Sequence, residues 1–318
     1  MVRKFSLLLA LTLGGLSAGA EASAGPDDVD TWIARMGEAL RTENYAGIYT
    51  YMRGQQFDTV KVVHRYEDGQ EFERLVHLNG ELREIIRHGD EIVCHHGAGA
   101  TDDLDHGVPP GPFTHAFNEN LANFQSFYDL ELLGKDRIAG RAAVKVAITP
   151  RQGDRWGYRL WIDEESGLLL QSHLLGRGKV LEVFQFTQVE IGAPIDPGMV
   201  ASTLPADAPS HEMSMPRANT VAQAQVRPQW RASWVPNGFR QVASPRPNRI
   251  VFSDGIATFS VFIERKPANS RGEFGALMGG TAVISRRLKD SSEQITVVGE
   301  VPIDTAKKVA ESIEPVIY

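Results

Sequence analysis

The sequence predicts an α+β fold in two domains: a large curved antiparallel sheet, an open half-barrel enclosing helices, and a smaller mixed sheet-plus-helix domain. The chain has 318 residues, of which 42% are apolar and 23% charged, and this length and composition suit two globular domains. Many short segments rich in β-branched and aromatic residues alternate with turn signals. Five prolines in residues 192–217 predict a linker, although a long loop within one domain is the less favoured alternative.

The first twenty residues have the pattern of a signal peptide. Arg3 and Lys4 precede an apolar run over residues 5–16, and Ala18-Gly19-Ala20 fits the small-residue cleavage pattern. We therefore expect cleavage near Ala20 and export to the periplasm as a soluble protein. An uncleaved membrane anchor is the less favoured alternative, because the run is short for a bilayer.

The large domain, residues 21–191, is predicted to open with a helix. Asp27, Asp28 and Asp30 would lie at its positive end. Its apolar residues recur at helical spacing: Val29, Trp32, Ile33, Met36 and Leu40. A second helical pattern contains Phe113, Phe117, Leu121, Phe124 and Tyr128. The two helices would fill the concave side of the sheet.

The strands of the large domain are predicted from β-rich segments separated by pairs such as Asp68-Gly69 and Asn79-Gly80, which tolerate the positive φ of tight hairpins. Because adjacent strands twist by roughly 20 to 25 degrees, so many antiparallel strands should form a curved sheet. The predicted strands cover residues 47–53, 59–66, 72–78, 82–88, 91–96, 142–149, 158–163, 168–175 and 180–191.

The smaller domain, residues 218–318, combines strands with a closing helix. Strands are predicted at residues 239–242, 250–252, 257–264, 282–288 and 294–301. Asp304 is the predicted N-cap of the helix, and the apolar face of that helix consists of Ala306, Val309, Ala310 and Ile313.

The distribution of charged residues also differs between the two predicted domains. Residues 21–217 carry a net charge of −13 and residues 218–318 a net charge of +4. This asymmetry indicates units with different partners, or units that attract each other. We do not expect nucleic-acid binding, because an exported acidic chain lacks the stripe of basic residues that binds phosphates.

The sequence offers no catalytic signature, and we expect neither enzymatic activity nor a cofactor. Possible metal ligands gather at Cys94, His95, His96, Asp102, Asp103, Asp105 and His106. Because side chains alternate along a strand, Cys94 and His96 would share one face while His95 points the other way. The remaining residues lack ligand spacing, so a metal site is the less favoured interpretation. The role of the single cysteine is left open.

Several runs along the chain resemble the periplasmic sigma-E regulator family RseB/MucB. They are YAGIY at 45–49, ERL at 73–75, NGELREIIR at 79–87, LWID at 160–163, SGLLL at 166–170, LEVFQFT at 181–187, WVPNGF at 234–239 and VFSDGIATFSVF at 251–262. The resemblance spans essentially the whole mature chain. It implies that the first domain is similar to the lipoprotein carriers LolA and LolB.

The resemblance also implies a function. Such a protein would bind the periplasmic domain of a transmembrane anti-sigma factor and shield it from site-1 proteolysis, until lipopolysaccharide or lipoprotein acyl chains release it. A periplasmic lipoprotein or lipid carrier is the alternative, and a homodimer is possible. The lipid-binding candidates are Trp32, Ile33, Met36, Phe117, Leu121 and Phe124. The partner-binding candidates are Arg231, Arg240, Arg286 and Arg287.

Overall fold

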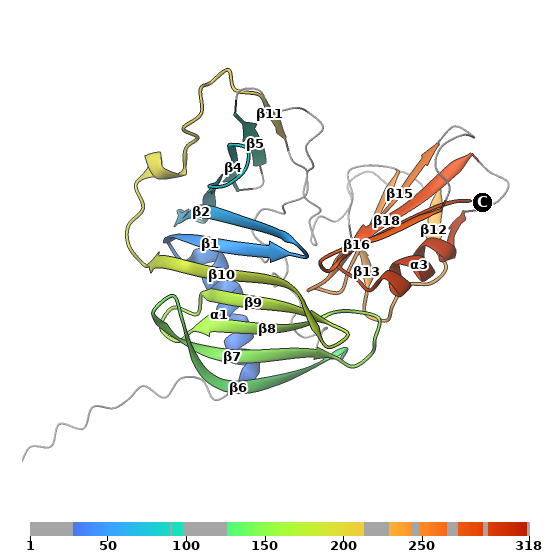
Figure 1. Cartoon of the computed structure of the whole chain (residues 1–318), viewed down its shortest axis with the longest axis horizontal. Coiled ribbons are helices and arrows are strands. Elements are labelled where there is room, and N and C mark those ends of the chain that lie inside the picture. The colour runs from blue at the N-terminus through green and yellow to red at the C-terminus, as the bar shows by residue number, and fades with distance from the viewer. Residues whose placement is uncertain are drawn as a thin grey trace, which may run out of the picture.

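The structure is a computed structural model that describes residues 28–89, 91–97, 126–212, 229–242, 248–265, 273–288 and 292–316. Two antiparallel sheets dominate it, one within the N-terminal half (residues 28–212) and one within the C-terminal half (residues 229–316) (Figure 1). Each half has its own cluster of buried apolar side chains. Among the described residues, neither helix is long and apolar enough to cross a membrane.

The N-terminal half begins with α1 (Val29–Thr42), as the sequence predicts. Asp28 caps it, because its carboxylate accepts a hydrogen bond from the Asp30 amide at 3.4 Å. The apolar face packs on the large sheet, where Trp32, Ile33 and Met36 are almost fully buried. Burial of this face stabilises a helix that would be marginal in isolation at this length.

The large sheet has eleven strands in the order β11-β5-β4-β3-β2-β1-β10-β9-β8-β7-β6. Every described pairing in it is antiparallel, and Asp68, Gly69, Gly80 and Gly89 have the positive φ predicted for its turns. The strands before residue 192 are β1 (Tyr45–Arg53), β2 (Gln56–Glu67), β3 (Gln70–His77), β4 (Arg83–His88), β5 (Glu91–His96), β6 (Tyr128–Ile138), β7 (Arg141–Pro150), β8 (Gly157–Asp163), β9 (Leu169–Gly176) and β10 (Lys179–Ile191).

The predicted pair of enclosing helices is only partly confirmed. The sheet is open and strongly twisted, since β4 and β5 run in a clearly different direction from β7 to β10 (Figure 1). Within the described ranges, α1 alone covers the large sheet. The second helical pattern falls mostly on residues 98–125, outside the described residues, and its last member, Tyr128, begins β6 instead. The predicted signal peptide also lies outside the described residues.

The described part of the segment after β10 packs against the large sheet. It contains the short 3-10 helix η1 (Pro197–Val200) and β11 (Ser210–Glu212), which pairs with β5 at the edge of the large sheet. We call residues 196–212 the docked segment. Glu84 on β4 holds it, accepting hydrogen bonds from Ser202 Oγ at 2.8 Å and Thr203 Oγ1 at 2.6 Å.

The C-terminal half consists of a six-stranded sheet in the order β13-β14-β15-β18-β17-β16, a two-stranded ladder and one helix. The sheet strands are β13 (Arg240–Val242), β14 (Arg249–Ser253), β15 (Thr258–Arg265), β16 (Phe274–Met278), β17 (Thr281–Arg287) and β18 (Glu293–Gly299). The ladder pairs β12 (Trp230–Ala232) with β19 (Ile313–Pro315).

The helix of this half, α3 (Ile303–Ser312), packs its predicted apolar face on the sheet. One detail of the prediction is wrong, since the N-cap is Pro302 and Asp304 lies within the first turn. There the carboxylate of Asp304 still favours the positive end of the helix dipole.

Candidate functional site

The two halves meet at a polar joint built around Arg155 and Asp254. Arg155 lies in the loop before β8, and Asp254 in the turn between β14 and β15. The Arg155 guanidinium donates to Asp254 Oδ2 at 2.8 Å, and the side chains are 2% and 0% exposed. Tyr128 Oη donates to the same oxygen at 2.9 Å. A charged pair this deeply buried fixes the relative position of its two elements, because neither charge can be left without its partner.

The rest of the turn and loop orient this pair. The other carboxylate oxygen of Asp254 accepts from the backbone amides of Ile256 at 3.0 Å and Ala257 at 2.8 Å. The Arg155 guanidinium also lies over the rings of Phe127 and Phe239, 5.1 Å from each centroid. Both groups therefore have little rotational freedom at the joint.

A second part of the joint lies at the turn between β16 and β17. The Trp156 indole donates to the Gly280 carbonyl at 2.8 Å, and the Gly280 amide donates to Glu182 Oε1 on β10 at 2.8 Å. Tyr51 on β1 donates to the other oxygen of Glu182. At Gly279, where φ is +57°, an added Cβ would lie 2.5 Å from Glu182 Oε1, so only glycine permits this close approach. Figure 1 shows the ends of β1 and β10 facing the small sheet.

Two carboxyl groups at the joint lie in surroundings that disfavour their charged form. Burial raises the pKa of Glu182, even though Tyr51 and the Gly280 amide donate to it. Burial and the nearby charge of Glu182 raise the pKa of Glu300, which follows β18, to about 8. This part of the joint therefore binds protons near neutral pH.

The apolar core of the N-terminal half continues into the joint. Ile256, in the turn of the C-terminal half, is 4% exposed and belongs to the same buried cluster as Trp156, Leu174 and the α1 residues. Thr305 at the start of α3 adds a hydrogen bond to the Asp154 carbonyl at 2.9 Å. Packed side chains thus connect α1 to the C-terminal half without a break.

The predicted lipid-binding residues divide into two groups. Trp32, Ile33 and Met36 lie together between α1 and the large sheet, with exposed fractions of 3%, 1% and 0%. Phe117, Leu121 and Phe124 lie outside the described residues. In this arrangement a lipid chain could reach the first group only by displacing part of the packing beneath α1.

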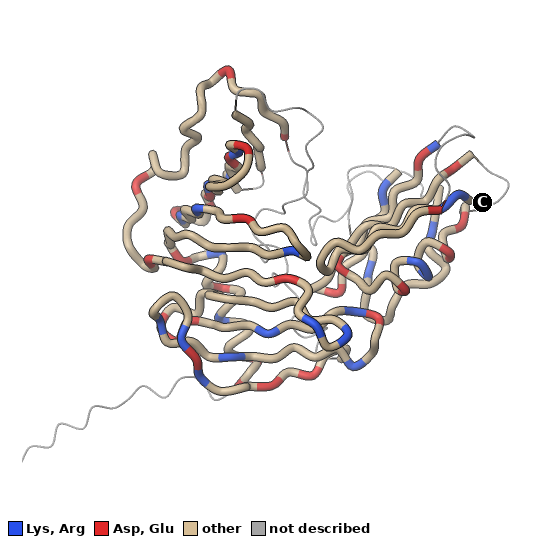
Figure 2. The backbone as a smooth tube through the Cα atoms, viewed as in Figure 1, with Lys and Arg blue, Asp and Glu red and all other residues tan. Residues whose placement is uncertain are grey.

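The predicted partner-binding arginines all lie in the C-terminal half, on three different strands. Arg231 on β12 forms an ion pair with Glu314 at 2.7 Å, and Arg240 is exposed on β13. Arg286 and Arg287 lie on β17. Figure 2 shows Lys and Arg interspersed with Asp and Glu along the described backbone of both halves.

Beside Arg286 lies an apolar edge that the sequence did not reveal. In the described part of the chain, β16 forms the outer edge of the small sheet and pairs only with β17. Phe274, Leu277 and Met278 are 50%, 46% and 44% exposed there. An edge strand with exposed apolar side chains is a template for pairing with another chain.

Sequence reasoning also missed the residues of the joint. The joint residues belong to three short segments that only the tertiary fold brings together: the loop with Arg155 and Trp156, the turn with Asp254, and the turn with Gly280. One signal was present in the sequence, since Asp254-Gly255 and Gly279-Gly280 are turn pairs between apolar strands. That signal predicts turns and not their contacts.

Together these features define a class: a mostly-β protein of two antiparallel-sheet units that share a packed polar joint and present an apolar sheet edge. Comparison with known proteins narrows the class. Residues 28–204 match the family model of the MucB/RseB N-terminal domain, and residues 224–314 match that of the MucB/RseB C-terminal domain. The chain belongs to the MucB/RseB family.

Individual relatives agree along the whole chain. It is 37% identical over 330 residues to the sigma factor AlgU regulatory protein MucB of Pseudomonas aeruginosa, covering 99% of this chain and 98% of that protein. It is 26% identical to the sigma-E factor regulatory protein RseB of Escherichia coli, covering 96% of each. A solved complex of Pseudomonas aeruginosa MucA and MucB matches with a TM-score of 0.72 and 34% identity, covering 92% of this chain and 100% of that chain.

Proposed function

We propose that this chain is a periplasmic negative regulator of an envelope-stress sigma factor. It binds the periplasmic segment of a transmembrane anti-sigma factor and shields that segment from site-1 proteolysis. The observation that carries this proposal is the match of both halves to one family, a member of which was solved in complex with MucA(peri). Export after removal of residues 1–20 and a division into domains near residues 192–217 are part of the same proposal.

The edge strand β16 is the docking surface that the geometry favours. An extended segment of the partner could add to this edge through backbone hydrogen bonds. Phe274, Leu277 and Met278 of this chain would then cover the apolar side chains of that segment. Arg286 lies on the neighbouring strand β17. Its ion pair with Glu273 is long, with 4.0 Å between Arg286 Nε and Glu273 Oε1. The favoured occupant is therefore an extended segment that carries both apolar and acidic residues.

Leu277→Lys tests this docking surface. A lysine on the edge strand opposes pairing with another chain, so we expect the Kd for the anti-sigma segment to rise roughly tenfold or more, as for other central interface residues. Leu82→Lys is the matched control, because Leu82 is similarly exposed, at 48%, but lies in the turn between β3 and β4 of the large sheet. Equal Kd values for both variants and the unaltered chain would place docking elsewhere.

We further propose that acyl chains release the partner by acting through the joint. A lipid that enters beneath α1 must displace side chains of the cluster that contains Ile256. The contact between the halves would then change, and with it the surface that they jointly present. Such a ligand acts only through unequal affinity for the two arrangements, and a shift from 1:99 to 99:1 needs about 5.5 kcal/mol.

A protease-protection assay tests the release. The unaltered chain should protect the anti-sigma segment from site-1 protease, and lipopolysaccharide or a lipoprotein acyl peptide should reduce that protection. Arg155→Ala should protect weakly even without lipid, because the joint loses its buried guanidinium. Arg151→Ala is the control in the same loop, since Arg151 forms only an exposed ion pair with Asp129.

Lipid that binds without changing protection would contradict the release step. Together with failure to bind any anti-sigma segment, that outcome would favour the alternative of a lipid carrier. A homodimer remains a prediction, which sedimentation velocity on the purified chain would test.

A further inference from the structure

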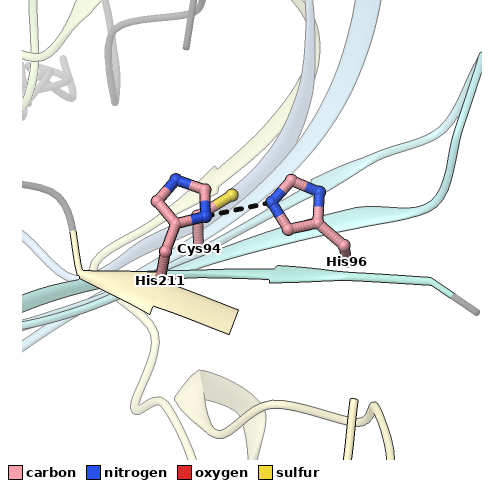
Figure 3. A group of neighbouring side chains, drawn as sticks. All are labelled: Cys94, His96 and His211. Atoms are coloured by element: carbon pink, nitrogen blue, oxygen red, sulfur yellow. Dashed lines mark hydrogen bonds between the residues drawn. The ribbon is translucent and has the colours of Figure 1, made fainter. Parts of the chain in front are cut away.

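Three potential metal ligands meet at the edge of the large sheet, away from the joint. Cys94 and His96 lie on β5, and His211 lies on β11 in the docked segment. Their ligand atoms all lie within 4.8 Å of one another. Figure 3 shows the thiol and both imidazoles on the same side of the two strands.

The antiparallel register explains why these side chains meet. Cys94 and His96 are two residues apart on one strand, so they share a face. His211 is the direct cross-strand partner of Cys94, and directly opposed residues also share a face. His95, between the two ligands, points to the other face. Strand alternation predicts that Cys94 and His96 share a face, but no local pattern adds His211, which is 115 residues further along than His96.

The spacing of the ligand atoms fits a small cation that prefers nitrogen and sulfur. His96 Nε2 and His211 Nδ1 are 3.3 Å apart, and the rings are stacked with centroids 5.1 Å apart. In a tetrahedral zinc site, with Zn–N near 2.0 Å and Zn–S near 2.3 Å, ligand atoms lie about 3.3 to 3.6 Å apart. The nitrogen pair already has this spacing, and small side-chain rotations would bring the sulfur in. Oxygen-seeking Ca²⁺ and Mg²⁺ do not fit these donors.

We propose that Cys94, His96 and His211 form a three-ligand site for a zinc-class divalent ion. On binding, the Cys94 thiol releases its proton to solvent, and the thiolate and two neutral imidazoles donate to the metal. The proton of the hydrogen bond between the two histidines moves to the other ring nitrogen of its own imidazole, so that both facing nitrogens are free to bind the metal. The fourth position of the ion is left for water or for a side chain of a partner.

The proposed ion would fasten the docked segment to the large sheet. β11 is only three residues long, and His211 is the single ligand that it supplies. Ligands from two strands close a loop that contains the whole chain between β5 and β11. A bound ion should therefore suppress local opening of β11, as any ligand that binds only the closed form does.

Cobalt binding tests the site, with the purified chain free of any polyhistidine tag. Co²⁺ should give a thiolate-to-cobalt charge-transfer band and the visible bands of tetrahedral coordination, and Zn²⁺ should bleach both. His211→Ala should raise the Kd for Co²⁺ roughly tenfold or more, since even indirect changes around metal sites cost about 10- to 100-fold. Cys94→Ser should remove the charge-transfer band.

His95→Ala is the matched control, because it removes the neighbouring imidazole on the opposite face of β5. Circular dichroism would confirm that each variant is folded, and hydrogen exchange at residues 210–212 would slow with Zn²⁺ but not with Mg²⁺. Absence of a cobalt spectrum, or a spectrum that His211→Ala and His95→Ala alter equally, would overturn the proposal.

Discussion

The joint and the docked segment each have a carboxyl group whose pKa is shifted, but the two shifts have opposite directions. At the docked segment, burial alone would raise the pKa of Glu84, yet hydrogen bonds from Arg74, Thr203 and Ser202 lower it to about 2. At the joint, burial and Glu182 raise the pKa of Glu300 to about 8. The docked segment is therefore held across the physiological pH range, whereas the joint is weakened as pH rises.

The difference shows where the molecule can change its shape. Glu84 is a carboxylate that is fully satisfied by donors, and one of these is the guanidinium of Arg74 at 2.7 Å. Glu300 has a neighbouring carboxylate in Glu182 instead. The contact near Glu300 and Glu182 therefore costs less free energy to open than the contact at Glu84. A low cost of opening is expected of the part of a regulator that moves.

Breaking the central pair of the joint should have the largest effect on stability. Asp254→Ala leaves Arg155 with Asp154 as its remaining ion-pair partner and removes the acceptor of Tyr128 Oη and of two backbone amides, so the free energy of unfolding should fall by about 3 to 5 kcal/mol. Urea unfolding followed by tryptophan fluorescence measures this, since Trp156 lies at the joint. Asp129→Ala is the control, because its pair with Arg151 is exposed and worth less than about 1 kcal/mol. Equal losses in the two variants would contradict the importance of the buried pair.

Removing the charge of Glu84 should have an intermediate effect. Glu84→Gln weakens the charge-assisted bond from Arg74 and should cost about 1.5 to 3 kcal/mol. Because the pKa of Glu84 is lower in the folded state, its contribution is present above the ordinary value of 4.5 and is lost as pH falls towards 2. Acid unfolding of the unaltered chain should show this loss. Glu91→Gln, at an exposed position on β5, should leave the acid transition unchanged.

For a change of one pH unit, the pH response of the joint should be the smallest effect, and it should have the opposite sign. A carboxyl whose folded pKa exceeds its unfolded value favours folding most below 4.5, and this advantage is lost as pH rises to about 8. Glu300→Gln should remove that dependence, which amounts to about 1.4 kcal/mol for each pH unit between these two values. Hydrogen exchange of residues 279–280 across this range is the measurement. Exchange that responds equally to pH in both chains would show that Glu300 does not control the joint.

Much of the fold could be predicted because its signals are local. Strand pairs joined by Asp68-Gly69 or Asn79-Gly80 carry their own turn chemistry, and α1 carries an apolar face. β6 was missed because Tyr128 also continues a helical spacing, and the sheet overrides that local pattern. β11 was missed because three residues among prolines show no periodicity, and its strand character comes only from pairing with β5.

The sites could be predicted less well, for a related reason. Strand alternation placed Cys94 and His96 on one face, but cross-strand register added His211. The lipid-binding candidates Trp32, Ile33 and Met36 were selected as an apolar helix face, and the sequence does not show whether such a face packs on protein or on a ligand. The joint depends on Arg155 meeting Asp254 across 99 residues of chain, a contact that no spacing rule encodes.

The point at which the docked segment ends limits how far the C-terminal half can travel. Pairing with β5 anchors the chain as far as Glu212, and residues 213–228 then reach at most roughly 60 Å even when fully extended. If the joint opens, the two surfaces thus remain at a high effective concentration, of millimolar order for a short tether. Reclosure would be intramolecular and independent of how much of the protein the cell makes, so the regulator could rearm without new synthesis.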